Sequence, residues 1–220
     1  KSGFAFPANY PAWSLFWELF ANLLFGWIML RPNFQRSSWI AVTAGLVGLA
    51  GLAAWRGNID AGVEIQDFWL GAPRVLYGFF AGVLIHGVWK RGIVRWTFPF
   101  WLSVTILLGI FAAPMQGASR AIWDFVSATV LLPVLVIFSL GRKDSALSSG
   151  LGDASYAVYV IQAPLIILLN GGLLHLGINL SAWGALGTGA IALSALIAAL
   201  LLDRLYDAPV RNWLSRLAYG

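Results

Sequence analysis

The stretch "PAWSLFWELFANLLFGWIML", residues 11–30, decides the fold class, because it is long and apolar enough to cross a membrane as one helix. A helix of ~20 residues spans the ~30 Å of hydrocarbon in a bilayer. The stretch nevertheless carries Ser14, Glu18 and Asn22, which are spaced four residues apart and therefore share one helical face. A carboxylate inside a bilayer is costly unless it faces protein or water. We therefore expect this polar stripe to face a cavity or a neighbouring helix.

The composition places the whole chain in a membrane. Of its 220 residues 60% are hydrophobic and only 10% are charged, and the mean hydropathy is +0.79. Soluble domains carry about 25% charged residues, so we expect an integral protein of the cell (inner or plasma) membrane. The chain has no cysteine, which excludes disulfides and thiolate chemistry. Its two histidines, His86 and His175, do not form a metal-ligand pattern, so no metal is expected.

Seven apolar segments predict an all-α, polytopic membrane helix bundle of about seven transmembrane helices, forming a single membrane domain over residues 1–220. None shows the alternation of a membrane β-barrel strand. The segments cover residues 13–30, 39–55, 73–89, 97–113, 121–140, 154–174 and 182–202. Residues 203–220 mix Arg with Leu, Trp and Tyr, and we expect them to form a cytoplasmic interfacial tail.

The positions of Lys and Arg predict the orientation. Most of the fourteen basic residues fall in alternate connections, which by the positive-inside rule face the cytoplasm. These connections are 31–38, 90–96, 141–152 and 203–220. Asp60, Glu64 and Asp67 gather in a connection of the other set, so the N-terminus is expected outside and the C-terminus inside. Topology also explains the pI near 9.9, and no nucleic-acid partner is expected.

Glu18 and Arg74 are predicted to lie at a similar depth near the outer surface. Glu18 follows Trp13, an interfacial aromatic residue, and either ties two helices by hydrogen bonds or lines a substrate site where it positions or deprotonates a hydroxyl. Arg74 either snorkels to the headgroups or faces inward, to pair with Glu18 or to bind an anionic substrate group. Gly78 and Gly82 have a spacing that lets a neighbouring helix approach closely.

A third polar group lies on the segment that contains Pro164. Ser155, Tyr159 and Gln162 share one helical face there, and they either pack between helices or line a site. Pro164 has no N–H to donate, so a carbonyl of its helix is freed and we expect a neighbouring polar group to bind it.

Two further charged features have simple interpretations. Arg120 and Asp124 are four residues apart and are expected to form an ion pair near the outer surface. His86 lies toward the basic inner end, where a lone histidine is more often hydrogen-bonded than catalytic.

These stretches together resemble the acyltransferase-3 family of multi-pass membrane O-acyltransferases. The family pattern opens with Trp-Ser-Leu and a Glu three residues later, matched here by Trp13, Ser14, Leu15 and Glu18. The pattern continues with an Arg before a Phe-rich, Gly-containing helix, matched by Arg74, Phe79, Phe80 and Gly82. It ends with a Leu-Gly, Ser-Tyr, Tyr, Pro string, matched by Leu151, Gly152, Ser155, Tyr156, Tyr159 and Pro164. Gln162 stands where the family has a histidine.

The resemblance implies transfer of an acyl group, usually acetyl, from acetyl-CoA or another acyl-CoA to a hydroxyl of a cell-envelope or exported glycan or a lipid-linked saccharide. It also implies that the chain is the C-terminal portion of the domain. The first helices, with the histidine that acts as base, are expected to precede it, so that Glu18 only assists and this portion alone is inactive. The residues expected to contact substrate are Trp13, Ser14, Glu18, Asn22, Arg74, Tyr77, Ser155, Tyr156, Tyr159 and Gln162. Those expected to attract the phosphates of coenzyme A are Lys90, Arg91, Arg95, Arg142 and Lys143.

Two other classes of function fit the same sequence. A transporter or flippase-like protein for a lipid-linked or anionic solute would use the polar stripe as a permeation site and show discontinuous helices in two related halves. A non-catalytic membrane scaffold would pair its polar groups with one another and leave no cavity.

Overall fold

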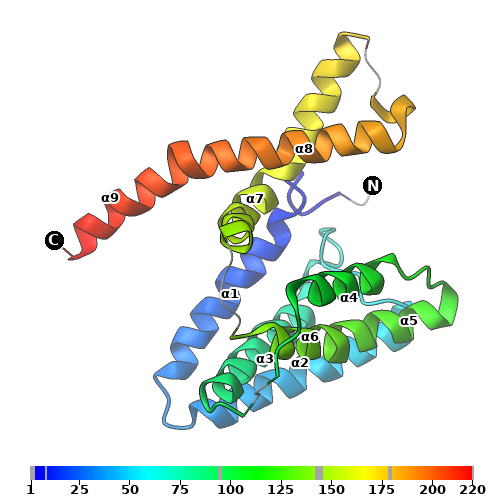
Figure 1. Cartoon of the computed structure of the whole chain (residues 1–220). Coiled ribbons are helices and arrows are strands. Elements are labelled where there is room, and N and C mark those ends of the chain that lie inside the picture. The colour runs from blue at the N-terminus through cyan, green and yellow to red at the C-terminus, as the bar shows by residue number, and fades with distance from the viewer. Residues whose placement is uncertain (1–2, 8, 94–95, 142–145, 178–179, 220) are drawn as a thin grey trace. The chain divides into compact units, whose positions relative to one another are not determined.

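The computed structural model describes residues 3–7, 9–93, 96–141, 146–177 and 180–219, and nearly all of these are helical (Figure 1). The elements are α1 (Ala12–Met29), α2 (Phe34–Arg56), η1 (Phe68–Gly71), α3 (Ala72–Lys90), α4 (Phe100–Ala112), α5 (Gly117–Val126), η2 (Ser127–Leu131), α6 (Leu132–Ser139), α7 (Ala146–His175), η3 (Leu180–Trp183), α8 (Ala185–Leu202), η4 (Asp203–Asp207) and α9 (Ala208–Tyr219). Within these ranges no strand occurs, and the only β-pairing described is an isolated antiparallel bridge between Phe4 and Glu64. The all-α prediction is confirmed.

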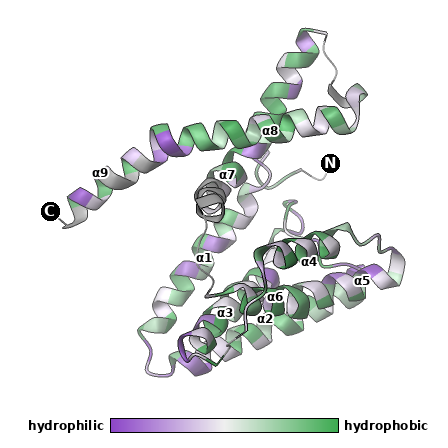
Figure 2. Ribbon diagram, viewed as in Figure 1, coloured by the Kyte–Doolittle hydropathy of each residue, from purple (hydrophilic) through white to green (hydrophobic). Residues whose placement is uncertain are grey.

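Six helices of the described chain are long and apolar enough to cross a membrane. They are Ala12–Met29, Phe34–Arg56, Phe68–Lys90, Gly117–Ser139, Ala157–His175 and Ala185–Asp207. Figure 2 shows hydrophobic residues, in green, along much of the long helices. Many of their large apolar side chains are exposed, which is the pattern of helices that face lipid. The chain is a multi-pass membrane protein.

The fourth of the seven apolar segments, predicted over 97–113, forms a shorter helix than expected. α4 has 13 residues, which at a rise of 1.5 Å per residue span about 20 Å. Proline limits it at both ends. Pro99 precedes its first turn with an extended backbone, and Ala113, which precedes Pro114, is also extended. Proline disfavours the helical conformation at the residue that precedes it, so α4 ends before Ala113.

The chain forms two compact units. Unit 1 comprises Lys1–Ala5 and Trp13–Lys143, and unit 2 comprises Phe6–Ala12 and Asp144–Gly220. The assignment of residues 1–220 to one membrane domain stays a prediction.

In unit 1, α2 and α3 lie side by side (Figure 1), and two glycines of α2 permit their close approach. A Cβ atom on Gly45 would lie 2.5 Å from the backbone nitrogen of Tyr77, and one on Gly48 would lie 2.7 Å from the ring of Pro73. The interpretation of Gly78 and Gly82 as the close-approach residues is wrong, because a Cβ at either would meet nothing within 4 Å in the described structure. Close packing through small residues is typical of membrane helices, but here α2 supplies them.

In unit 2, α7 packs against α8. The buried residues of this pair are small: Ala163 on α7, and Gly187, Ala195 and Ala199 on α8. α8, η4 and α9 continue one another as a single rod, drawn from orange to red in Figure 1. The predicted tail, residues 203–220, is therefore helical over its described part, while its place at the membrane interface stays a prediction.

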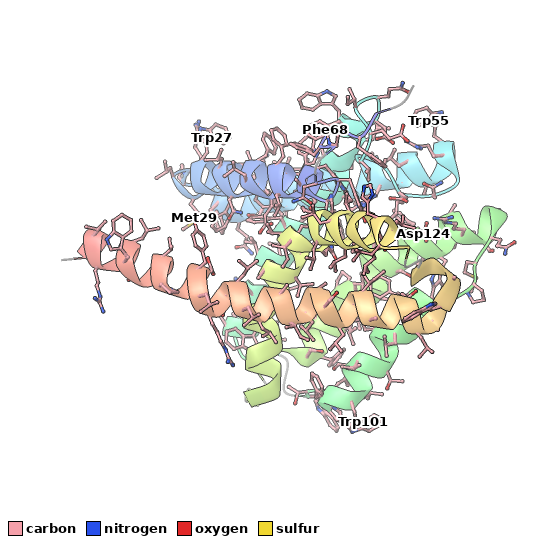
Figure 3. All side chains as sticks on the ribbon, turned by 90° about the horizontal axis from the view of Figure 1, so that it is seen from above. Trp27, Met29, Trp55, Phe68, Trp101 and Asp124 are labelled. Atoms are coloured by element: carbon pink, nitrogen blue, oxygen red, sulfur yellow. The ribbon has the colours of Figure 1, made fainter. Side chains whose placement is uncertain are left out.

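Tryptophans stand at both ends of unit 1. Trp55 and Trp69 are exposed beside the connection from α2 to α3, and Trp27 and Trp101 are exposed toward the opposite end. Figure 3 shows Trp27, Trp55 and Trp101 pointing away from the ribbons. Tryptophan is enriched where a membrane helix meets the interface, so the two groups mark the two membrane surfaces.

Candidate functional site

The Trp-Ser-Leu motif begins α1 with a buried tryptophan. The indole of Trp13 packs against the connection between α2 and α3, where glycine is required at two positions. A Cβ on Gly62 would lie 2.7 Å from Cζ3 of Trp13, and one on Gly71 would lie 2.8 Å from the same atom. Gly62 also has a φ of 107°, in the left-handed region that favours glycine. One turn later, Trp17 donates its indole N–H to the carbonyl of Phe68 at 3.2 Å. The start of α1 thus holds this connection in place.

A single carboxylate shapes the 57–67 loop, the part of the connection that precedes η1. One oxygen of Asp67 accepts the backbone N–H groups of Gly62 at 3.0 Å and Glu64 at 3.1 Å, and the other accepts from Arg56 at 2.8 Å. Partial burial works against ionisation, but these hydrogen bonds and the charge of Arg56 outweigh it and lower the pKa of Asp67 below its usual 3.8. The ionised carboxylate therefore stabilises the fold of the loop.

Arg74, on the first turn of α3, binds this loop. Its guanidinium donates to the carbonyls of Ile59 and Ala61, lies 3.8 Å from a carboxylate oxygen of Asp60, and stands 5.4 Å from the ring centroid of Trp13. The contact with Trp13 is a cation–π interaction. Arg74 therefore binds the 57–67 loop, and the carboxylate that it pairs with is Asp60. No ion pair with Glu18 occurs in the described structure.

A partly open cavity of about 560 Å³ lies beside Arg74 within unit 1. It runs between the 57–67 loop, the end of α4 and the α5–η2–α6 helix. Its wall combines two arginines, two aspartates and one serine with apolar and aromatic side chains. The lining residues are Ile59, Asp60, Arg74, Ile110, Phe111, Ala113, Met115, Arg120, Trp123, Asp124, Ser127, Ala128 and Leu132. Arg120 and Asp124 form the predicted ion pair, at 3.5 Å.

The π-helical turn η2 contributes a polar residue to the lining of this cavity. π-Helical turns inside α-helices are rare and frequently occur at functional sites. Ser127 opens η2, and its hydroxyl is buried with no hydrogen-bond partner in the described structure. Two residues on, the carbonyl of Thr129 accepts the phenol of Tyr77 at 2.5 Å. Tyr77, predicted to contact substrate, is thus engaged in a buried bond between α3 and η2 and does not line the cavity.

The polar stripe of α1 lies apart from this cavity. Glu18 and Asn22 are exposed and Ser14 is half-buried, and none of the three lines it. The side-chain amide of Asn22 donates to the backbone carbonyl of Glu18 at 2.9 Å, within its own helix. The structure therefore brings together Trp13 and Arg74 of the predicted site, and it leaves the role of Glu18 a prediction.

The predicted residues of α7 lie in unit 2. The carbonyl of Val160, four residues before Pro164, accepts the side-chain amide of Asn9 at 2.9 Å. This confirms the prediction that a polar side chain compensates for the missing N–H of Pro164. The phenol of Tyr159 donates to the carbonyl of Pro11 at 2.8 Å, so two hydrogen bonds join the segment before α1 to α7.

The other residues predicted on α7 contribute less. The hydroxyl of Ser155 donates to the carbonyl of Gly152 at 2.7 Å within the helix. Gln162 is half-buried, and the side chain of Tyr156 lies outside the described residues. A shared site of Ser155 and Gln162 with Arg74 stays a prediction.

The end of unit 1 that lies away from the 57–67 loop is basic. Arg31 stacks over Trp27 at 4.3 Å from the ring centroid, and Lys90 and Arg91 at the end of α3 are exposed. Arg95, Arg142 and Lys143 lie outside the described residues. His86 is exposed with its ring 5.6 Å from that of Trp89, and His175 is exposed near the end of α7. The described residues include no group of three metal-ligating side chains.

Sequence reasoning missed Asp60 and Ser127 as site residues. Asp60 was recognised only as part of an acidic loop, although that loop directly precedes Arg74. Ser127 lies three residues after Asp124, a spacing that puts both side chains on one helical face. That spacing was the available signal.

The comparisons with known proteins identify the family. No curated protein and no solved structure matches the chain. A family model described as an acyltransferase domain matches residues 2–201, which is nearly the whole sequence and includes the cavity, α1 and α7. The chain belongs to the acyltransferase-3 family and is a membrane enzyme that transfers acyl groups.

Proposed function

We propose that this acyltransferase moves an acetyl group from acetyl-CoA to a hydroxyl of a cell-envelope or exported glycan. In this reaction the hydroxyl oxygen attacks the thioester carbonyl, an ester forms, and the thiol of coenzyme A leaves with the proton of the hydroxyl. The family match carries the acyl-transfer chemistry. The two chemically different ends of unit 1 support the assignment of donor and acceptor to opposite membrane surfaces.

The basic end is proposed to face the cytoplasm and to receive the acyl donor. Arg31, Arg36, Lys90 and Arg91 are exposed there. Positive charge at this end of unit 1 raises the local concentration of a polyanion such as coenzyme A. The positive-inside rule gives the same orientation, because basic connections stay in the cytoplasm.

The end that carries the 57–67 loop is proposed to face outward and to receive the glycan. Arg74, Asp60 and the cavity beside them lie at this end, between apolar helices. Glu18 lies in the first half of α1, toward the same end of unit 1, and is proposed to orient the acceptor hydroxyl. Ser14 and Asn22 share its helical face and are proposed to assist it. The scaffold alternative predicted no cavity, and the family match favours an enzyme over the transporter alternative.

The test is a matched pair of substitutions in the full-length protein. Glu18→Gln and Glu64→Gln make the same change at the two glutamates of the chain, one on α1 and one in the 57–67 loop. Membranes would be supplied with isotope-labelled acetyl-CoA, and ester-linked label on the glycan would be measured by mass spectrometry. We expect Glu18→Gln to abolish labelling while the protein still inserts, and Glu64→Gln to retain it. Normal labelling in Glu18→Gln would remove Glu18 from the site.

A further inference from the structure

The cavity beside Arg74 contains buried polar groups that the protein itself does not satisfy. Ser127 is 7% exposed, and neither its hydroxyl nor Nε of Arg74 has a hydrogen-bond partner in the described structure. Buried polar atoms without partners are costly, and native proteins keep few of them. Both groups lie in the wall of the same cavity, so a molecule bound there would satisfy them.

The charges around the cavity balance. Arg74 lies 3.8 Å from Asp60, and Arg120 lies 3.5 Å from Asp124. Two guanidinium groups and two carboxylates leave no net charge to select an anion or a cation. They do leave N–H donors and carboxylate acceptors, because each guanidinium has five donors and each carboxylate about four acceptor positions. A ligand that uses both kinds of group must donate and accept at neighbouring atoms, as hydroxyl groups do.

The cavity is also lined by apolar and aromatic side chains. Trp123 and Phe111 contribute aromatic rings, and Met115 adds an apolar side chain. The indole N–H of Trp123 donates to the carbonyl of Ile110 at 3.2 Å, which fixes the ring. A mainly apolar lining with a few polar groups is usual for a small-molecule site, and about 560 Å³ lies within the usual range of such sites.

We infer that this cavity binds a pyranose ring of a neutral, hydroxyl-rich saccharide. Ser127 and Nε of Arg74 donate hydrogen bonds to its oxygens, and Asp60 and Asp124 accept from its hydroxyls. Its C–H face packs against Trp123. The inference rests on the proposed function in one respect only, namely that this saccharide is the acyl acceptor.

The test measures binding separately from transfer. Methyl pyranosides of glucose, galactose, mannose and N-acetylglucosamine would be titrated into the full-length protein in lipid nanodiscs, with saturation-transfer NMR as the readout. Inorganic phosphate and cyclohexanol serve as an anionic and an apolar comparison. We expect at least one pyranoside to bind in preference to both.

Ser127→Ala is the decisive variant because the hydroxyl has no partner in the described structure of the free protein but is inferred to bond the sugar in the complex. The substitution therefore has different effects on stability and on binding. Removing an unsatisfied buried hydroxyl leaves the melting temperature of the free protein unchanged or raises it. Losing its bond to the sugar weakens pyranoside binding about fivefold, and Asp124→Asn weakens it by about tenfold or more. Ser119→Ala is the matched control, since Ser119 lies on α5, donates to the carbonyl of Gln116, and does not line the cavity.

Two results would overturn the inference. One is phosphate binding in the absence of any pyranoside binding, and the other is unchanged pyranoside affinity in Ser127→Ala. Pyranoside binding that depends on Ser127, found together with a lack of acyl transfer to any glycan, would support this site and contradict the proposed function instead.

Discussion

The phenol of Tyr77 donates a hydrogen bond of 2.5 Å to the carbonyl of Thr129, the residue four positions before Pro133. Pro133 has no N–H to offer that carbonyl. Unit 2 repeats the relationship, since the amide of Asn9 donates to the carbonyl of Val160, four positions before Pro164. In each unit a side chain from another segment takes the place of a helical hydrogen bond that proline cannot make.

The first prediction concerns the bond in unit 1. Tyr77→Phe leaves the carbonyl of Thr129 without this donor and should lower the free energy of unfolding by about 1–2 kcal/mol, measured by thermal denaturation in nanodiscs. In a Pro133→Ala background the restored N–H should reduce that loss. Tyr206→Phe, at an exposed position of η4, is the control and should be neutral. An equal loss with and without Pro133 would contradict the account.

The second prediction concerns the bond in unit 2. Asn9→Ala should release the segment before α1 from α7, so that hydrogen exchange of Tyr10 and its neighbours becomes faster. Pro164→Ala should partly restore the stability of α7 in the same protein, because Val160 then regains a backbone donor. Unchanged exchange in Asn9→Ala would show that the bond to Val160 does not hold this segment.

The third prediction tests the packing of Trp13. Gly71→Ala adds a Cβ 2.8 Å from Cζ3 of Trp13 and 3.0 Å from Nε1 of Trp17. Overpacking of this kind costs about 1–3 kcal/mol. Gly78→Ala is the matched control, because its Cβ meets nothing within 4 Å and should not lower stability. Equal melting temperatures for the two variants would show that Trp13 does not pack tightly against Gly71.

The fourth prediction concerns pH and the 57–67 loop. Because the pKa of Asp67 is lowered in the folded protein, its stabilising effect is complete above the ordinary value of 3.8 and is lost as the pH falls through the lower folded value. Asp67→Asn should remove it already at neutral pH. Exchange protection of the amides of Gly62 and Glu64 reports the effect, and Glu64→Gln should keep it. Full protection in Asp67→Asn would contradict the role of the carboxylate.

Much of the architecture could be predicted because a membrane-spanning helix requires a long apolar segment, which is visible in the sequence. The short α4 could have been recognised from Pro99 and Pro114, which bracket it. The compensation at Pro164 was predicted, but its partner was not, because Asn9 lies far from Val160 in the sequence. The site was harder still. Side-chain direction decides whether a glycine faces a neighbour, so Gly45 carried no distinct signal of its own. For Ser127 the only signal was its spacing from Asp124, which does not show that the shared face lines a cavity.

Arg74 offers the most direct test of the central claim, that a membrane acyltransferase holds its glycan acceptor in the cavity lined by Asp60 and Arg74. Arg74→Lys keeps the charge but loses the forked donors to the 57–67 loop and the stacking on Trp13. Arg216→Lys, in the exposed part of α9, is the control.

The measurement is the transfer of isotope-labelled acetyl from acetyl-CoA to the glycan by the full-length protein in sealed membrane vesicles. We predict ester-linked label with the natural protein and with Arg216→Lys, and a loss on the order of tenfold with Arg74→Lys, equivalent to one charge-assisted interaction. Absence of label from the glycan with the natural protein, or full transfer in Arg74→Lys, would contradict the claim.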